Sequence, residues 1–341
     1  MNDIGEGTIR RIDWTELTPV VLLLRVFNIT LGFRILFLAM IGLWLTVVLE
    51  YLAGISLLTG LLVSGKELHL GRSAILIEGI GNTIHLVQQN PVLLLWLFAV
   101  VLVWTFCGGM ICRIVAVRLT IDESEPAGSL FVFFRKHGIS FVSSLVILLL
   151  GILCCFLPVI LAGWLLTVPV LNYVVAALFP IPLFSAFLTV LLALGFAMGF
   201  MLLFAAVSTE GSDGFDAISR MFAYIYQRPL HYILYWIYCG ILGWLGYLLV
   251  FFVFTSPVIQ LCWWYLGDSD SIVEFWLDVF SSLPVAYVFA WFWTSSVAIY
   301  LLLRRSVDAT PFSEVYRVSA PKVRVLPTIK PDEHGAPEIR N

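Results

Sequence analysis

Long stretches without a charged residue divide the sequence. A helix needs about 20 residues to cross a bilayer core of about 30 Å, so uncharged runs of this length are the main signal for membrane spans. Four such runs occur: between Glu78 and Arg113, between Lys136 and Glu210, between Arg228 and Asp268, and between Asp278 and Arg304. The run after Lys136 is long enough for two spans, with Pro169, Pro180 and Pro182 between them. These four runs therefore predict five spans.

An earlier span is less regular because it contains Glu50. This acid divides the apolar run from Ile35 to Gly65 into two parts, each too short to cross a bilayer alone. Glu50 is therefore expected within the crossing or at its outer edge. The six predicted spans cover residues 35–63, 91–112, 140–166, 183–208, 230–256 and 282–303. The pattern predicts an all-α, polytopic membrane helix bundle with six transmembrane helices.

The composition excludes two other classes of protein. The chain has 341 residues, of which 61% are hydrophobic and 12% are charged, whereas an ordinary soluble domain has roughly 45–50% apolar and about 25% charged residues. So apolar a chain is neither a water-soluble globule nor a disordered protein. The net charge is −3, and no dense basic run interleaved with aromatic residues marks a nucleic-acid interface. We expect membrane lipids and other membrane proteins as partners, and no nucleic acid.

The basic residues predict the orientation. If the N-terminus is cytoplasmic, all of the 19 Lys and Arg residues except Lys66 and Arg72 fall in inner segments. Because inner loops of membrane proteins carry an excess of Lys and Arg, both termini are expected on the inside. The predicted location is a bacterial cytoplasmic (inner) membrane.

The predicted span region, residues 35–303, is flanked by two cytoplasmic segments. In the N-terminal segment, residues 1–34, the apolar run from Val20 to Leu24 has no cleavage site behind it, so it predicts a helix lying in the membrane interface. Outside the membrane, helical spacing of isoleucines predicts an amphipathic helix within residues 64–90. The C-terminal segment, residues 304–341, mixes prolines with charges and predicts a flexible tail.

Two inner loops show a weak internal sequence repeat. Ala116-Val117 and Ala206-Val207, about 90 residues apart, are each followed by acids, then aromatic residues, then bases, then a new span. Each loop predicts a short helix whose aromatic face and bases meet lipid headgroups. The basic candidates for headgroup contact are Arg113, Arg118, Arg135, Lys136, Arg220 and Arg228. The alternative is that unrelated inner hairpins collect the same residue types.

A resemblance appears at these loops. The run from Gly108 to Val117, the Ser129–Phe141 segment and the run from Ser212 to Pro229 resemble a family of uncharacterised multi-pass inner-membrane proteins of planctomycete-type bacteria. More distantly, the last run resembles the membrane domain attached to some glycerophosphodiester phosphodiesterases. The resemblance implies a membrane bundle and carries over no catalytic residue.

Few residues suggest chemistry. No phosphate-binding loop, zinc-protease motif, nucleophile elbow or dinucleotide fingerprint occurs, so no catalytic, cofactor or metal site is expected. Glu50 predicts either an intramembrane proton or cation site or an interfacial acid at the outer headgroups. Gly195 and Gly199 predict a small-residue face for close helix packing, either within the bundle or between two copies.

These observations favour a non-enzymatic scaffold that organises membrane components. The alternative is a small-solute or lipid transporter that uses Glu50 as an intramembrane acid. A membrane-embedded enzyme is the third hypothesis, because no cluster of nucleophilic or metal-binding residues is expected at one depth.

Overall fold

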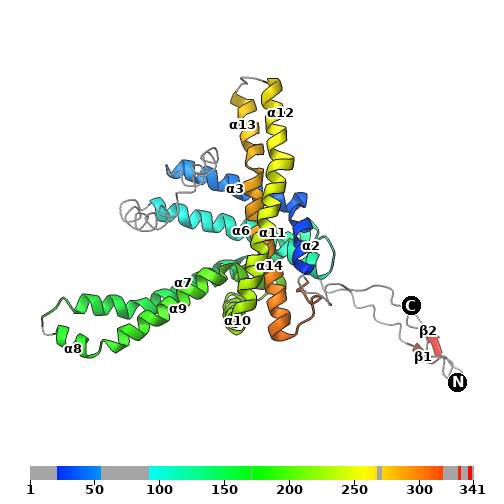
Figure 1. Cartoon of the computed structure of the whole chain (residues 1–341). Helices are drawn as coiled ribbons and strands as arrows, with labels where there is room; N and C mark the ends of the chain where they lie inside the picture. Colours follow the sequence, from blue (N-terminus) through cyan, green and yellow to red (C-terminus); the bar gives the residue numbers. More distant parts are fainter. Residues whose placement is uncertain are drawn as a thin grey trace.

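The computed structural model describes residues 21–54, 92–169, 171–266, 271–317, 329–331 and 337–339 (Figure 1). The helices are α2 (Val21–Thr30), α3 (Phe33–Ala53), α6 (Val92–Thr120), α7 (Ala127–Leu165), α8 (Leu171–Ala177), α9 (Pro180–Glu210), α10 (Gly214–Gln227), α11 (Pro229–Leu249), the π-helix η2 (Val250–Thr255), α12 (Ser256–Leu266), α13 (Ser271–Ser281) and α14 (Leu283–Asp308). Two three-residue strands, β1 (Ile329–Pro331) and β2 (Pro337–Ile339), pair antiparallel near the C-terminus.

Six helical stretches of the described chain are long and apolar enough to cross a membrane. They are Phe33–Ala53, Val92–Thr120, Ala127–Leu165, Pro180–Glu210, Pro229–Tyr265 and Ile272–Asp308. Each matches one of the spans expected from the sequence, so the prediction of an all-α bundle with six transmembrane helices is confirmed. The chain is an integral, multi-pass membrane protein.

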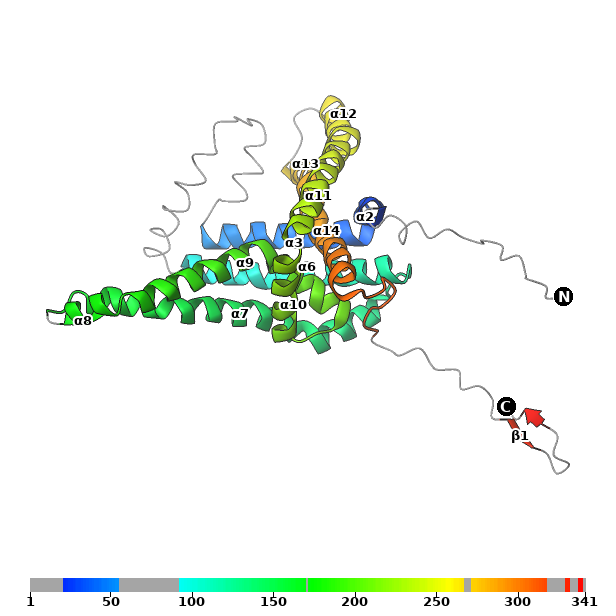
Figure 2. The same ribbon diagram turned by 60° about the horizontal axis from the view of Figure 1, so that its bottom comes forward.

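The six stretches form three hairpins that meet at one end. The hairpins are α3 with α6, α7 with α9, and α11–α12 with α13–α14 (Figure 1). The starts of α3, α7 and α11 and the ends of α6, α9 and α14 lie together with α10; we call this region the junction. From it, the α3–α6 and α7–α9 hairpins extend to one side, while the third leaves in another direction (Figure 2). The junction therefore gathers all six helix ends that the basic residues assign to the cytoplasm.

Helix α14 lies at the centre of the packing. It contacts α2, α3, α6, α9, α10 and α11, and its second half is almost continuously buried, from Ala290 to Arg304. The outer half of α7 is different, because Leu149, Leu150 and Leu153 are each about half exposed. The core therefore sits at the junction, and the hairpins carry apolar side chains away from it.

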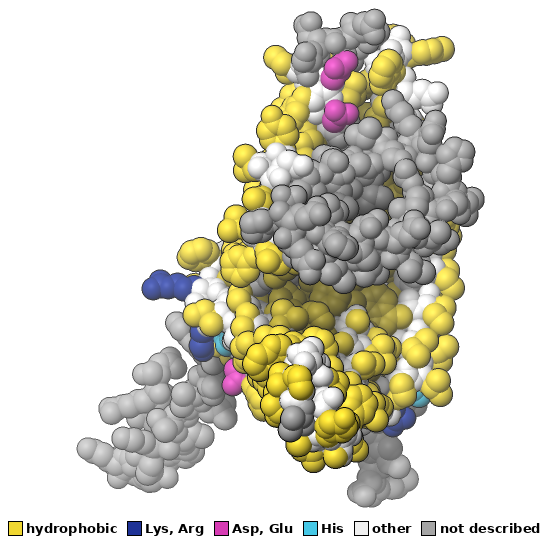
Figure 3. All heavy atoms as spheres, turned by 90° about the vertical axis from the view of Figure 1, so that its left-hand side faces the viewer, with side chains coloured by type: hydrophobic (Ala, Val, Ile, Leu, Met, Phe, Trp, Pro, Cys, Tyr) yellow, Lys and Arg dark blue, Asp and Glu magenta, His cyan; other side chains and the backbone are white. Residues whose placement is uncertain are grey.

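The exposed surface of the hairpins is apolar. Viewed along the α7–α9 hairpin, the described surface is dominated by hydrophobic side chains and is hollowed beside the hairpin tip (Figure 3). Ile181, Phe184, Phe187 and Val190 on α9 are all more than half exposed. Such a surface suits lipid or another membrane protein rather than water.

The loop helix expected at 129–141 is not separate from the third span. Both belong to α7, a single helix of 39 residues, which is about 58 Å long at about 1.5 Å per residue and so longer than a bilayer core. Gly138 alone does not break the helix, because a single glycine costs only about 1 kcal/mol. In the second loop, α10 and α11 are separate, because Pro229 cannot continue the hydrogen bonding of α10.

The fifth span is longer than expected because the helix passes through a proline. Pro257 follows the π-helix η2, in which Thr255 Oγ1 donates a hydrogen bond to the Val250 carbonyl (3.1 Å). The wider turn of the π-helix accommodates the backbone N–H that Pro257 lacks, and the helix continues through α12.

The structure differs from two terminal predictions. Helix α2 buries Leu22, Leu23 and Val26 and packs on α14, so these side chains do not face lipid, and its place in the membrane interface stays a prediction. The tail does not start at residue 304: α14 continues to Asp308, and residues 309–317 fold back onto the junction. The end of the first span at residue 63 and the predicted outer helix within 64–90 lie outside the described residues.

Candidate functional site: an ion-pair network at the junction

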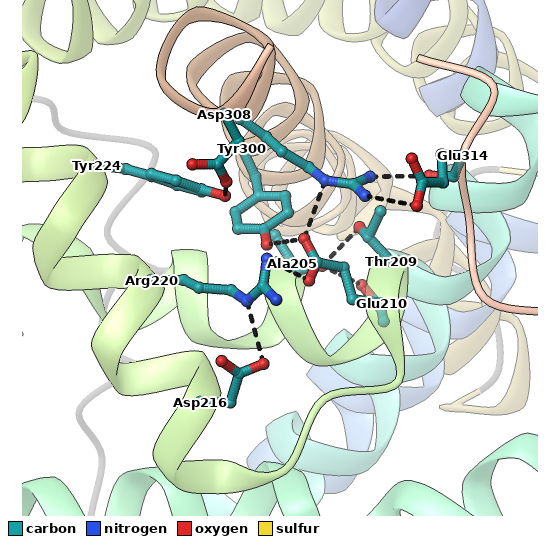
Figure 4. Close-up of polar contacts among 11 residues, drawn as sticks. Ala205, Thr209, Glu210, Asp216, Arg220, Tyr224, Tyr300, Asp308 and Glu314 are labelled. Atoms are coloured by element: carbon teal, nitrogen blue, oxygen red, sulfur yellow. Dashed lines mark hydrogen bonds and ion pairs between the residues drawn. The ribbon is translucent and has the colours of Figure 1, made fainter. Parts of the chain in front are cut away.

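Glu210 is the centre of a cluster of charged and polar side chains at the junction. It is the last residue of α9, and its carboxylate contacts Arg220 Nη1 (2.6 Å), Arg304 Nε (3.0 Å) and the Tyr300 hydroxyl (2.6 Å). Arg220 belongs to α10, and the other two belong to α14 (Figure 4). One carboxylate thus connects three helices.

Local sequence explains how Glu210 reaches this place. Gly211 ends α9 with a φ of +64°, a left-handed conformation that glycine adopts without steric cost. The chain then turns at once, and the Asp213 side chain accepts a hydrogen bond from Asp216 N (2.9 Å) to cap α10. Arg220, four residues after Asp216, pairs with both Asp216 and Glu210.

The charges in the network stabilise one another. Burial alone lowers the pKa of the Arg220 guanidinium, but its interactions with Glu210, Tyr300 and Asp216 together more than offset this and raise the pKa above its usual value. Burial, and then the hydrogen bond to Asp308, raise the pKa of the Tyr224 phenol, so it remains a donor at neutral pH. Arg220 therefore stays charged and Tyr224 stays protonated.

Residues 309–317, which we call the C-terminal strap, cover this network. Tyr316 N donates to the Thr209 carbonyl (2.8 Å), and Arg304 Nη1 donates to the Glu314 carbonyl (2.8 Å). The strap and the network enclose a pocket of about 670 Å³ lined by Glu210, Arg220, Arg304, Asp308 and Glu314, among others. Its lining carries both signs of charge.

A second buried ion pair lies nearby. Arg113 on α6 donates through Nε and Nη2 to the two carboxylate oxygens of Glu125 (2.9 and 3.2 Å) and through Nη1 to the Ser208 carbonyl (2.9 Å). Its guanidinium also lies 4.3 Å from the centre of the Phe133 ring. Arg113 is 1% exposed, so the expected contact with lipid headgroups is wrong. The acidic loop between α6 and α7, residues 121–126, folds back and provides Glu125 as an internal partner.

The other basic candidates occupy different environments. Arg220 is part of the network, and Lys136 donates to the Tyr316 hydroxyl (2.8 Å). Arg118, Arg135 and Arg228 are exposed. Of the six candidates, only these three are free of ion pairs and hydrogen bonds within the described residues, and their contact with lipid stays a prediction.

Glu50 lies far along α3 from the junction, in the last turn of that helix. It is 1% exposed, so its environment is an interior one. The structure does not bring it together with Arg113, Glu210 or Arg304. Its role in proton or cation movement stays a prediction.

Gly195 and Gly199 lie against α10. A Cβ atom on Gly195 would approach Phe222 Cε1 to 2.3 Å, and one on Gly199 would approach Ile225 Cδ1 to 2.4 Å. The glycine face therefore packs within the chain, the first of the two expected alternatives.

Sequence reasoning missed the network of Glu210, Tyr300 and Arg304. The available signal was Glu210 and Arg304, each placed at the inner end of a long uncharged run, but such positions are also typical of residues at a membrane surface. Within the described residues, no group of three or more His, Cys, Asp or Glu side chains is placed to hold a metal ion.

Comparison with protein-family models, curated proteins and solved structures finds no match to this chain.

Proposed function

We propose that the chain is a non-enzymatic protein of a bacterial inner membrane that organises other membrane components, protein or lipid, around its junction. The observation that carries this proposal is the pairing of buried charge within the chain. Glu210 is held by two guanidinium groups and a hydroxyl, and Arg113 is held by Glu125 and a backbone carbonyl. Charges engaged in this way fix helices in place and offer little to a substrate.

The hairpins provide the surface for association. Outside the junction, α7, α9 and α11 expose apolar side chains over most of their length. A fixed junction with projecting apolar helices suits lateral contact with neighbours in the bilayer, where close packing of helices drives association. The orientation and the inner-membrane location rest on the distribution of basic residues.

Photo-crosslinking tests this function. Benzoylphenylalanine at Leu153 on α7 or Phe187 on α9, both more than half exposed, should give adducts of defined mass in the native membrane. The same variants reconstituted alone in lipid vesicles provide the control and should give lipid adducts only. Gradient-driven solute or proton flux through the reconstituted chain, with no protein adduct in the native membrane and no lipid enriched around it, would overturn the proposal.

Glu50 favours a second candidate function. An acid that is 1% exposed on a helix long enough to span the membrane by default suggests a transport role. A transporter that uses Glu50 should lose proton- or cation-coupled uptake in vesicles when Glu50→Gln removes the charge and keeps the shape. Equal behaviour of the variant and the wild-type chain in uptake, stability and phenotype would support the organising function instead.

A further inference from the structure

A small pocket lies where α3 begins and α6 ends. Its volume is about 140 Å³, and its lining includes Gly32, Phe33, Arg34, Arg118 and Ser124. None of these residues belongs to the ion-pair network around Glu210. The pocket is therefore a separate site, and two arginines, Arg34 and Arg118, belong to its lining.

Within the part of the chain that the structure describes, no carboxylate neutralises the positive charge of this pocket. Arg118 forms no ion pair or hydrogen bond within the described residues, and its side chain is exposed. Arg34 donates through Nη1 to the Glu125 carbonyl (3.0 Å) and pairs with no carboxylate of the described chain. Both guanidinium groups retain donors for an anion.

The acidic loop beside the pocket does not neutralise these charges. Of its carboxylates, Asp122 is paired with Arg25, and Glu125 is held by Arg113. Glu123 is exposed, and no ion pair joins it to either arginine of the pocket. The pairing within the loop leaves Arg34 and Arg118 as the cationic groups at this place.

The start of α3 adds to the attraction for an anion. Gly32 is the N-cap of this 21-residue helix and provides no side-chain acceptor for the first-turn N–H groups, which carry the positive end of the helix dipole. A Cβ atom on Gly32 would lie 3.4 Å from Arg118 Nη1. The guanidinium of Arg118 therefore lies beside the helix start, where both act on the same ligand.

An apolar stripe leads from the pocket along α3. Phe33, Phe37, Ile41 and Leu45 recur every four residues and are 80%, 54%, 37% and 45% exposed. The rings of Phe33 and Phe37 stack with centroids 5.7 Å apart. Because Phe33 is also the first residue of the first membrane-spanning helix, the stripe begins at the pocket and continues into the bilayer.

We propose that this pocket binds the phosphate group of an anionic phospholipid from the predicted inner leaflet, with the acyl chains lying along the stripe from Phe33 to Leu45. The pocket has room for a phosphate group and not for a whole lipid, so the rest of the molecule lies outside it. Free phosphate shares the headgroup chemistry, but only a lipid also uses the stripe. This inference goes beyond the proposed function, because the site serves equally in an organiser or a transporter.

The test is lipid binding by the purified full-length chain, measured by native mass spectrometry. Phosphatidylglycerol is the probe and zwitterionic phosphatidylcholine the comparison lipid. Arg118→Gln should raise the Kd for phosphatidylglycerol about tenfold, because hydrogen bonds between charged groups are the stronger class. Arg317→Gln removes an exposed arginine that lies outside the pocket and is not among the candidates for headgroup contact, and it should leave the Kd within about twofold.

A second variant separates the two sources of phosphate. Phe37→Ser alters the stripe at a residue outside the pocket lining, keeps both arginines, and should weaken phosphatidylglycerol binding several-fold while leaving the binding of inorganic phosphate unchanged. Equal losses in Arg118→Gln and Arg317→Gln, or equal affinity for the two lipids, would overturn the proposal. Binding of inorganic phosphate without preference for phosphatidylglycerol would overturn its lipid part and assign the pocket to a soluble anion.

Discussion

Glu210 Oε1 lies 3.0 Å from Arg304 Nε, and this contact joins the end of α9 to the last turns of α14. The two helices belong to different hairpins, and both side chains are about nine-tenths buried or more. The same carboxylate reaches Arg220 on α10. The position of α10 and of two hairpins therefore depends on one charged group.

Glu210→Gln should destabilise the folded chain strongly. The amide keeps the shape but leaves Arg304 and Arg220 without their shared counter-charge, and the loss of one partner from a buried ion pair typically costs about 3–5 kcal/mol. The midpoint of thermal unfolding in detergent provides the measurement.

Glu314→Gln is the matched control for Glu210→Gln. Glu314 Oε1 lies 4.0 Å from Arg304 Nη2, but the Glu314 side chain is 64% exposed. A pair of this kind contributes about 0–1 kcal/mol. If the two variants lowered the unfolding midpoint equally, Glu210 would not be the centre of the junction.

Arg113 and Glu125 should behave as a unit. Glu125→Gln leaves a guanidinium that is 1% exposed without a counter-charge and should cost about 3–5 kcal/mol, whereas Arg113→Met combined with Glu125→Leu should recover much of that loss. A double-mutant cycle of unfolding free energies measures the coupling. Additive losses would show that the two side chains do not act together.

The spans were predictable because their signal is local. A run of apolar residues between Lys136 and Glu210 has to cross a bilayer wherever its neighbours lie. The end of α7 at Leu165 and the start of α9 at Pro180 accordingly fall close to the predicted bounds. The separate loop helix was wrongly predicted because a break between loop helix and span depends on proline: Pro229 separates α10 from α11, whereas no proline occurs in α7 before Pro158.

The junction was not predictable because its contacts are distant in sequence. Arg113 is a basic residue at the inner end of a span, which is typical of a residue that contacts lipid phosphate. Only the fold shows that it is instead bound by Glu125 and the Ser208 carbonyl. Arg304 likewise marks the end of a span, but its burial comes from the strap around Glu314. No local pattern identifies such partners.

The glycine face of α9 should tolerate no large side chain. In Gly199→Leu, the added Cβ atom would lie only 2.6 Å from Met221 Cγ and 2.4 Å from Ile225 Cδ1, and the clash should cost about 1–3 kcal/mol. Gly151→Leu is the control, because nothing lies within 4 Å of a Cβ atom there. A similar shift of the unfolding midpoint in both variants would contradict the packing of α10 on α9.

The two loops at the junction, after α6 and α9, and the C-terminal segment should face the same side of the membrane. Reporter fusions after residues 125, 215 and 341 should all give a cytoplasmic signal, and fusions after residues 88, 176 and 270 a periplasmic one. The physical reason is that the inner segments carry all the basic residues except Lys66 and Arg72, and that the fold brings the ends of α6, α9 and α14 to one place. Opposite signals at 125 and 215 would separate two ends that Arg113 joins through the Ser208 carbonyl at 2.9 Å. Such a result would be incompatible with the junction itself, whereas inversion of all six signals would change only the side on which it lies.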